Sequence, residues 1–322
     1  MKVLVLGGTR FLGPFVVDEL LGRGHQVALL SRHEADHELP VRLYEGDASE
    51  PKTLQQAVRS WRPEGLIDML HNGPDWARSV VCACAGEVQR SVHLSCAAVY
   101  GRKPYCPVDE ETAVVDPKDA PPEVAAKLAA DDVVLEAAAR DEIPAVVLRL
   151  AELYGPRDPR CAEWYFARRA LDGRPRVALP DSGLQICHRG FVQNMARGVV
   201  RALTSPRASG HVYNLGEEKL YTLAQLAAGI ARALDHEWDI YSVPGNLWTT
   251  PYAYTSFFDI RKARSQLRYR DQMIPRDGLE LTMTWLSQHP RGEDWSYPGI
   301  EDPFGYTRED VLIEAHGVKL ES

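Results

Sequence analysis

The chain has 322 residues, and its hydrophobic content of 45% and charged content of 25% are those of a globular protein that can bury a large core. The net charge of −8 argues against a broad surface for nucleic acid or anionic membranes. No apolar run approaches the roughly 20 residues of a membrane span, and the opening MKVLVLGG is too short to be a signal peptide. The six scattered cysteines favour a reduced, cytoplasmic setting.

Two groups of potential metal ligands fall close together in the sequence. Cys82 and Cys84 form a C-x-C pair, but no second pair completes a zinc site. Histidine and acidic residues also gather at 33–37, directly after an expected strand, where a solvated loop is the simpler interpretation. We therefore predict no metal site.

Short apolar and β-branched runs alternate with helical patterns through the N-terminal half. The expected strands are 3–6, 26–30, 41–46, 65–70 and 91–95, and the expected helices are 14–21, 54–60 and 78–87. A longer helix, 123–140, then leads into a strand at 144–150. Continuous apolar strands separated by helices predict a parallel sheet that is covered on both faces.

The C-terminal half has a more mixed pattern, with two clear helices at 193–203 and 223–234. The predicted fold class is α/β: a Rossmann-type, doubly wound parallel sheet with a smaller mixed α/β C-terminal lobe. We expect a Rossmann domain at 1–155, to which parts of the later chain return, a substrate-binding lobe at 156–290, and a C-terminal extension at 291–322. The extension contains a strap rich in proline and aromatic residues, followed by a short helix.

The sequence VLVLGGTRFLG places a glycine-rich turn directly between an expected strand and an expected helix. Gly7 and Gly8 let the backbone turn tightly and approach a pyrophosphate, and Gly13 lets the helix pack closely. The helix N-terminus favours the phosphate charge. The predicted cofactor contacts of this turn are Gly7, Gly8, Thr9, Arg10, Phe11, Leu12 and Gly13. The alternative is a tight turn without a ligand.

The end of the second strand indicates which dinucleotide is bound. NAD sites place an acidic residue there for the ribose hydroxyls, whereas NADP sites supply an arginine. Here the strand ends in Ser31 and Arg32, and the guanidinium of Arg32 suits a 2′-phosphate. Arg10, inside the turn, adds a second positive charge. We predict NADP(H) in preference to NAD(H); the alternative is that Arg32 only begins a solvated loop.

These motifs resemble those of the NAD(P)-dependent epimerase/dehydratase family, the extended branch of the short-chain dehydrogenases/reductases. The resemblance covers roughly residues 1–285 through motifs that occur in the family's order. They are GGTRFLG, GHQVALLSR, EGDAS, VHLSCAAVYG, LRLAELYGPRD, RGFVQNMARGVVRAL and GHVYNLGEEKLYTLAQLA. The resemblance implies the family fold, and it places Asp47 of EGDAS where the family's acid contacts adenine.

Catalysis in that family rests on a serine or threonine, a tyrosine and a lysine, the last two spaced as Y-x-x-x-K. The resemblance places Lys127 at the lysine, which also holds the nicotinamide ribose. The tyrosine position is Glu123, and the hydroxyl position is Cys96, with Ser95 one residue earlier. Glu123 beside Lys127 would stay ionised, which makes it a poor proton donor but a candidate general base. Tyr100 belongs to the V-Y-G turn and is not the missing acid.

The residues that would contact a substrate give two opposing indications of its class. Glu152 stands where nucleotide-sugar members often carry asparagine, and a carboxylate there would repel a pyrophosphate. Arg189 stands where those members place a substrate-facing arginine, which favours such a substrate. The predicted substrate contacts are Asn72, Tyr154 and Arg189. Glu123, Glu152 or Tyr154 is the candidate replacement for the tyrosine, unless the two glutamates are simply solvated or salt-bridged.

Three functions are compatible with these residues. The leading hypothesis is an NADP(H)-binding enzyme with a non-standard proton-transfer group, which reduces a carbonyl, or epimerises or dehydrates a sugar-like or polyketide-like small molecule. The second is a sensor or scaffold that binds NADP(H) without catalysis, and the third is redox-neutral chemistry such as a cyclisation. The resemblance also implies a homodimer through the helix 123–140. Nucleic acid and membranes are not expected partners.

Overall fold

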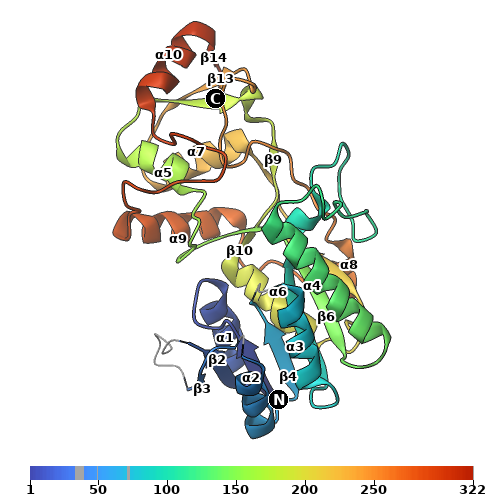
Figure 1. Cartoon of the computed structure of the whole chain (residues 1–322). Helices are drawn as coiled ribbons and strands as arrows, with labels where there is room; N and C mark the ends of the chain where they lie inside the picture. Colours follow the sequence, from blue (N-terminus) through green and yellow to red (C-terminus); the bar gives the residue numbers. More distant parts are fainter. Residues whose placement is uncertain (33–39, 49, 71–72, 322) are drawn as a thin grey trace. The chain divides into compact units, whose positions relative to one another are not determined.

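A computed structural model describes residues 1–32, 40–48, 50–70 and 73–321 of the chain (Figure 1). The chain forms two compact units. The first contains residues 1–152, 192–216 and 258–272, and the second contains residues 153–191, 217–257 and 273–322. The later chain therefore returns to the first unit twice.

The first unit contains a seven-stranded sheet. Its strands are β1 (Lys2–Leu6), β2 (Gln26–Ser31), β3 (Arg42–Glu45), β4 (Gly65–Asp68), β5 (Arg90–Cys96), β6 (Ala145–Leu150) and β11 (Val212–Leu215). Their order is β11-β6-β5-β4-β1-β2-β3, and the neighbouring strands are parallel, with Val5 of β1 opposite both Leu29 and Ile67. The central strands are buried apolar segments, which is the pattern of a parallel sheet covered on both faces.

Helices cover both faces of this sheet. They are α1 (Leu12–Gly22), α2 (Pro51–Trp61), α3 (Pro74–Cys84), α4 (Pro122–Ala139), α6 (Val192–Thr204) and α8 (Arg261–Gln266), with a 3₁₀ turn, η1, at Ala97–Tyr100. Helices α2, α3 and α4 pack side by side over one face, where they bury Leu4 and Leu30. Val5 points to the opposite face and lies beside Gly8 and Val17 of α1, and α1 packs against α6 (Figure 1).

The strand order changes direction at β1. The chain proceeds outward from β1 through β2 and β3, then crosses to β4 on the other side of β1 and continues outward through β5 and β6. Parallel strands that diverge in this way leave a crevice outside their carboxyl ends, where α/β proteins bind ligands. The glycine turn that follows β1 lies at this point.

The second unit is a smaller mixed α/β lobe. Its strands are β7 (Glu152–Tyr154, which begins at the last residue of the first unit), β8 (Arg176–Pro180), β9 (Ile186–Cys187), β10 (Arg189–Phe191), β12 (Tyr221–Thr222), β13 (Asp239–Val243) and β14 (Val318–Lys319). Its helices are α5 (Trp164–Leu171), α7 (Leu223–Ala233), α9 (Pro275–Gln288) and α10 (Tyr306–His316), with a 3₁₀ turn, η2, at Asp181–Gly183. Helices α5, α7 and α9 enclose the core of this lobe.

Residues 291–322, expected as a C-terminal extension, belong to the second unit. The expected short helix is α10, which is held by an ion pair between Glu309 and Arg169 of α5, both with fully buried side chains. Glu309 also accepts a hydrogen bond from the backbone N–H of Ala178 in β8 (2.9 Å). Strand β14 then pairs with β13 at the edge of a three-stranded sheet. The extension is thus an integral part of this lobe.

The predicted fold class is confirmed, and the strands and helices predicted for the N-terminal half are all present. The largest shift is in α3, expected to begin at residue 78 and found to begin at Pro74. Proline is favoured at the first helical position, and Gly73 before it has a φ of 81°, so the helix starts there. Helices α5, α8 and α9 are additions to the expected elements.

Candidate functional site

The chain between β1 and α1 forms a tight glycine turn that is closed onto the helix. Gly7 has a φ of 85°, in the region that favours glycine. A Cβ added to Gly13 would lie 2.5 Å from the carbonyl carbon of Gly8, so glycine alone fits there. The N–H of Gly13 donates to the carbonyl oxygen of Arg10 (2.8 Å), which closes the turn onto the helix. The tight turn and the close helix packing expected from these glycines are both present.

The end of β2 lies beside this turn. Ser31 is buried, and its hydroxyl oxygen lies 3.5 Å from that of Thr9. The side chain of the next residue, Arg32, is 67% exposed, and its Nη1 lies 3.8 Å from a carboxylate oxygen of Asp47. Because an exposed ion pair of this length is weak, the guanidinium can also serve an anionic ligand. Arg10 is exposed as well.

These residues fit a dinucleotide. Phe11 (φ 45°) precedes α1 and Leu12 is its first residue, so the N–H groups of the first helical turn lack intrahelical acceptors. No acidic residue occupies that turn, which leaves the partial positive charge of the helix N-terminus to a phosphate. The turn at Gly7–Gly13 would hold a pyrophosphate, and the recognition of a 2′-phosphate by Arg32 stays a prediction.

Four of the five residues predicted for catalysis lie on α4 and at the end of β5, which pack against each other, and the fifth, Glu152, begins β7. Lys127 is half-buried in the second turn of α4, and Glu123 is exposed in the first turn. Cys96, the last residue of β5, is half-buried. Ser95 is buried and donates a hydrogen bond to Asp131 of α4 (3.0 Å). The structure thus joins the two segments, and the catalytic roles of these residues stay predictions.

Tyr100 lies in the core of the first unit, which agrees with its exclusion as the missing acid. Its hydroxyl donates to Oδ1 of Asn214 (2.8 Å) and accepts a hydrogen bond from Nη1 of Arg149 (3.2 Å). Burial raises the pKa of this phenol, against the opposing effect of Arg149. A fully buried phenol with both of these partners is a structural group rather than a proton donor to a substrate.

Four charged side chains that the sequence reasoning did not single out form a buried charge group beside α4. They are Asp68, His93, Asp131 and Arg149. Nδ1 of His93 lies 3.4 Å from a carboxylate oxygen of Asp68, and Nε2 lies 3.6 Å from one of Asp131. Nε of Arg149 lies 3.4 Å from the other oxygen of Asp131. The group therefore runs continuously from β4 through β5 and α4 to β6.

The protonation state of His93 determines the net charge of this group. Burial alone would lower its pKa, but Asp131 and Asp68 raise it from 6.5 to about 9. His93 is thus protonated at neutral pH, and two cations face two carboxylates. The sequence carried a signal for this group, because Asp68 and His93 interrupt the apolar runs GLIDML and SVHLS at buried strand positions.

The predicted substrate residues Tyr154 and Arg189 lie in a second buried cluster, in the other unit. Nη1 of Arg189 donates to Oε1 of Glu163 (2.8 Å), and its guanidinium carbon lies 4.1 Å from the centre of the Tyr154 ring. The Tyr154 hydroxyl donates to Glu217 (2.7 Å), and the Tyr252 hydroxyl donates to the same Glu163 oxygen (2.8 Å). Within the described residues, Nε and Nη2 of Arg189 are buried without a hydrogen-bond partner.

This second cluster contains a charged guanidinium and a phenol that is a weak acid. Burial would lower the pKa of Arg189, but Tyr252, Tyr154 and Glu163 hold it well above its usual value, so the guanidinium stays charged. Burial also raises the pKa of Tyr154 well above its usual range, which makes this phenol a weak proton donor. Glu152 is half-buried at the start of β7. Asn72, also predicted as a substrate contact, lies outside the described residues.

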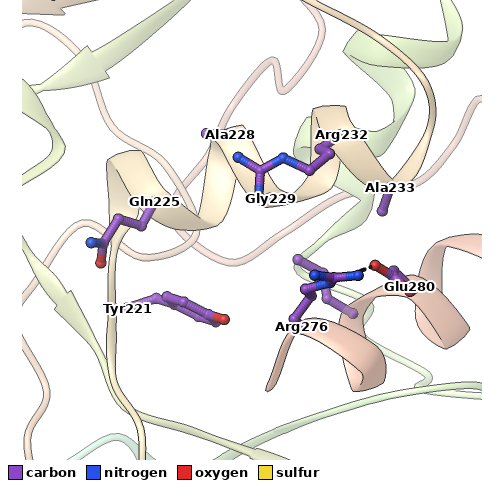
Figure 2. Close-up of a pocket in the computed structure, with 9 residues that line it drawn as sticks. Tyr221, Gln225, Ala228, Gly229, Arg232, Ala233, Arg276 and Glu280 are labelled. Atoms are coloured by element: carbon purple, nitrogen blue, oxygen red, sulfur yellow. Dashed lines mark hydrogen bonds and ion pairs between the residues drawn. The ribbon is translucent and has the colours of Figure 1, made fainter. Parts of the chain in front are cut away.

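A cavity of about 210 Å³ opens between α7 and α9 in the second unit. Figure 2 shows Tyr221 and Gln225 near the start of α7, Arg232 further along it, and the ion pair between Arg276 and Glu280 on α9. The residues that line this cavity include none of those predicted to bind cofactor or substrate. No sequence motif predicts this cavity, since its walls come from separate segments.

Among the described residues, no three His, Cys, Asp or Glu side chains gather in a way that would hold a metal ion. None of the described helices combines the length and the apolar character needed to cross a membrane.

Comparison with known proteins gives a family match for most of the first unit. The sequence profile of the NAD dependent epimerase/dehydratase family matches residues 3–216. The chain is 30% identical over 254 residues to 2′-dehydrokanamycin reductase of Streptomyces kanamyceticus, an alignment that covers 76% of this chain and 70% of that protein. It is 26% identical over 247 residues to the chloroplast stem-loop binding protein of 41 kDa b of Arabidopsis thaliana, which covers 72% of this chain. The alignment spans only 63% of that relative's length.

The fold is also similar to solved structures. One is UDP-glucuronic acid 4-epimerase from Bacillus cereus, solved in complex with UDP-glucuronic acid and NAD. It superposes with a TM-score of 0.75 over 90% of this chain and 100% of that chain, at 19% sequence identity. At this identity the likeness concerns the fold.

Proposed function

Because the chain belongs to the NAD dependent epimerase/dehydratase family, we propose that it is an NADP(H)-dependent enzyme that acts on a carbonyl or hydroxyl group of a small metabolite. The observation that carries this proposal is the closed glycine turn after β1, in which Gly13 lies against the backbone of Gly8. Such a turn packs the start of α1 against the end of β1, where the N–H groups of the helix N-terminus can face a pyrophosphate.

The choice of NADP(H) over NAD(H) rests on the end of β2. A hydroxyl residue, Ser31, closes the strand, and the exposed guanidinium of Arg32 follows it. A guanidinium matches the geometry and charge of a 2′-phosphate, whereas NAD sites carry an acid at this point. Arg10 places a second exposed cation in the adjacent turn.

The groups that would serve the reaction lie on α4 and β5. When bound, the nicotinamide cofactor supplies hydride transfer. Lys127 would hold the cofactor ribose and keep a positive charge near the reacting oxygen, while Cys96 occupies the place of the family's hydroxyl. With no tyrosine at the usual position, Glu123 is the candidate to hold or accept the proton at its carboxylate.

The substrate side is supported by the cluster around Arg189. A buried guanidinium with two nitrogen atoms lacking partners suits an oxygen-rich, anionic or strongly polar ligand. The relative from Streptomyces kanamyceticus is named as a reductase of 2′-dehydrokanamycin, which supports reduction of a carbonyl on a sugar-like molecule. A sugar-like substrate is therefore the proposed class.

One observation favours a different function. Glu123 is exposed in the first turn of α4, where a carboxylate is stabilised by the helix dipole without any catalytic role. If Glu123 serves only the helix, the protein binds NADP(H) as a sensor or scaffold, or uses it in redox-neutral chemistry. Turnover of NADPH with a sugar-like carbonyl compound excludes the sensor, and loss of one NADPH for each product excludes the redox-neutral enzyme.

The first experiment is calorimetric titration of the purified protein with NADPH and, separately, with NADH. We expect NADPH to bind more tightly. Arg32→Ala should weaken NADPH binding about tenfold to a hundredfold, since a hydrogen-bonded charged contact of roughly 1.5–3 kcal/mol is lost, and should leave NADH binding nearly unchanged.

A matched control is available in the same unit. Arg78 of α3 has a side chain that is 62% exposed and pairs with Asp75, as Arg32 pairs with Asp47. Arg78→Ala should leave the binding of both cofactors unchanged. Failure of the wild-type protein to bind either cofactor would overturn the proposed function, and equal loss of NADPH and NADH binding in Arg32→Ala would overturn the preference.

A further inference from the structure

The buried charge group of the first unit has no part in the function proposed above. Its side chains are at most 8% exposed, yet they carry four charges on β4, β5, α4 and β6. Ions taken out of water in this way lose their hydration, and a well-packed apolar group of similar shape is often at least as stable. Stability alone therefore does not account for the group.

Asp131 is the point where the group meets α4. Its carboxylate accepts a hydrogen bond from Ser95 (3.0 Å) and lies 3.4 Å from Nε of Arg149 and 3.6 Å from Nε2 of His93. Three polar groups from β5 and β6 thus converge on one helical side chain. Apolar contacts are non-directional, whereas these contacts fix both the height and the rotation of α4 over the sheet.

The position of Asp131 ties this group to the residues predicted for catalysis. Asp131 follows Lys127 by four residues, so the two side chains lie on the same side of α4, about 6 Å apart along its axis. Ser95 directly precedes Cys96 in β5. The bond between Ser95 and Asp131 therefore joins the segment that carries Lys127 to the segment that carries Cys96.

His93 extends this connection to the end of β4. Its partner Asp68 also accepts hydrogen bonds from Nε1 of Trp76 (3.0 Å) and from the backbone N–H of Leu70 (3.0 Å), which fixes the carboxylate in place. A protonated imidazole donates from both ring nitrogens and can serve both acids at once. The carboxyl ends of three adjacent strands and α4 are thereby held as one body.

We propose that Asp131 and His93 are positioning residues, which hold α4 and the end of β5 in the arrangement that Lys127 and Cys96 require at the cofactor. This inference rests on the proposed function, because the lysine has this task only where a dinucleotide binds. Neither residue contacts the reacting atoms in this scheme; both act through Lys127 and Cys96.

The test uses two variants, of which the first leaves the remaining buried charges paired and the second removes the charge of Asp131 alone. The double variant Asp68→Leu/His93→Leu removes both partners together, so Asp131 keeps Ser95 and Arg149. Asp131→Asn keeps the shape of the side chain and removes its charge. Each purified variant is checked for folding by circular dichroism and thermal melting, and is then titrated with NADPH in the calorimeter.

A second readout does not depend on the cofactor. The pH dependence of Lys127 modification by an amine-reactive reagent, followed by peptide mass spectrometry, reports the surroundings of this amine directly. The matched control is Asp75→Asn, which removes an exposed acid paired with Arg78 on α3. This control should change neither NADPH binding nor the modification of Lys127.

We expect both test variants to fold, to bind NADPH about tenfold more weakly, and to shift the pH midpoint of Lys127 modification, because small displacements of a positioned group have large effects. Asp131→Glu, which keeps the charge, should restore part of the affinity.

The proposal is wrong if folded variants retain wild-type affinity and an unchanged Lys127 midpoint, or if neither variant folds. If only the double variant fails to fold, the NADPH affinity and the Lys127 midpoint of Asp131→Asn decide whether the proposal holds. If the wild-type protein binds no NADPH, the proposed function fails, and the Lys127 midpoint still tests the positioning.

Discussion

Each unit of the molecule buries a histidine almost completely, and the two histidines respond to burial in opposite ways. His93, in the first unit, lies between the carboxylates of Asp68 and Asp131, and its pKa is raised to about 9. His188, in the second unit, has its Nε2 3.0 Å from the backbone carbonyl oxygen of Glu217, and burial lowers its pKa to about 4. The same side chain is therefore charged in one unit and neutral in the other at pH 7.

The difference lies in the partners and not in the depth of burial. Removal from water disfavours the protonated imidazole in both places. Two ionised acids overcome this effect at His93, whereas a neutral carbonyl group cannot do so at His188. Thus the first unit holds a charge-balanced group with a protonated histidine, and the second unit balances its buried Glu163 with Arg189.

The largest effect is expected from removing the arginine of the second unit. Arg189→Met leaves Glu163, whose side chain is 1% exposed, with the neutral hydroxyl of Tyr252 as its remaining donor among the described residues. An uncompensated buried carboxylate should cost about 3–5 kcal/mol of the free energy of unfolding. Urea unfolding followed by circular dichroism measures this loss. A loss below about 1 kcal/mol would show that Glu163 does not depend on the arginine.

The corresponding change in the first unit should be milder. Arg149→Met leaves Asp131 with the protonated ring of His93 and the hydroxyl of Ser95. The carboxylate keeps one cation and one hydrogen-bond donor beside it, so we expect a loss of about 1–3 kcal/mol in the same urea experiment. If this loss equals that of Arg189→Met, the protonated histidine does not compensate the acid, and the contrast between the two units disappears.

This contrast could not be predicted from the sequence, although the fold and the glycine turn could. The turn at Gly7–Gly13 and the strand end at Ser31 and Arg32 are short contiguous segments, and their chemistry follows from residue type and from the strand and helix on either side. Local patterns of this kind can be predicted from the sequence alone. The resemblance of ordered motifs then fixed the fold class.

The buried groups depend on contacts between distant segments. Asp68, His93, Asp131 and Arg149 are spread over some eighty residues, and they meet only because β4, β5 and β6 are adjacent in the sheet. A polar residue inside an apolar strand signals a buried partner but does not say which one. The sequence therefore predicted where Ser95 lies, yet not that its hydroxyl is committed to α4.

The next effect concerns the pH dependence of stability through His93. Its pKa is higher in the folded state, about 9, than the usual 6.5, so the folded protein binds this proton more tightly. The resulting stabilisation, on the order of 3 kcal/mol, is present in full below about pH 6.5 and is lost as the pH rises to about 9. Urea unfolding across this range should show the loss in the wild-type protein and not in His93→Gln. An equal slope in both proteins would contradict the raised pKa.

A smaller effect of opposite direction is expected from His188. Its pKa is lowered to about 4 in the folded state, so the unfolded chain takes up this proton first as the pH falls below 6.5. At about pH 5 the wild-type protein should have lost about 2 kcal/mol through this group. Asp158 acts against this trend, because burial raises its pKa to about 7, and a carboxyl group with a raised pKa stabilises the fold as the pH falls.

The measurement that isolates His188 is therefore a difference between two proteins. Urea unfolding of the wild type and of His188→Gln at about pH 7 and about pH 5 cancels the contribution of Asp158, which both proteins share. The variant should lose less stability on acidification than the wild type. If the two proteins lose the same amount of stability, His188 is protonated in the folded state at about pH 5, and its pKa is not lowered by burial.

The smallest effect is expected where a charge pair is not buried at all. Arg276 and Glu280 on α9 lie 3.0 Å apart, with side chains 68% and 49% exposed (Figure 2). Water solvates each group whether or not the other is present, so Glu280→Gln should leave the urea midpoint unchanged within error. The pair has the same chemistry as Arg189 and Glu163 and differs in exposure. A measurable loss in Glu280→Gln would show that exposure is not what separates weak pairs from strong ones here, and the two buried clusters would then need another explanation for their importance.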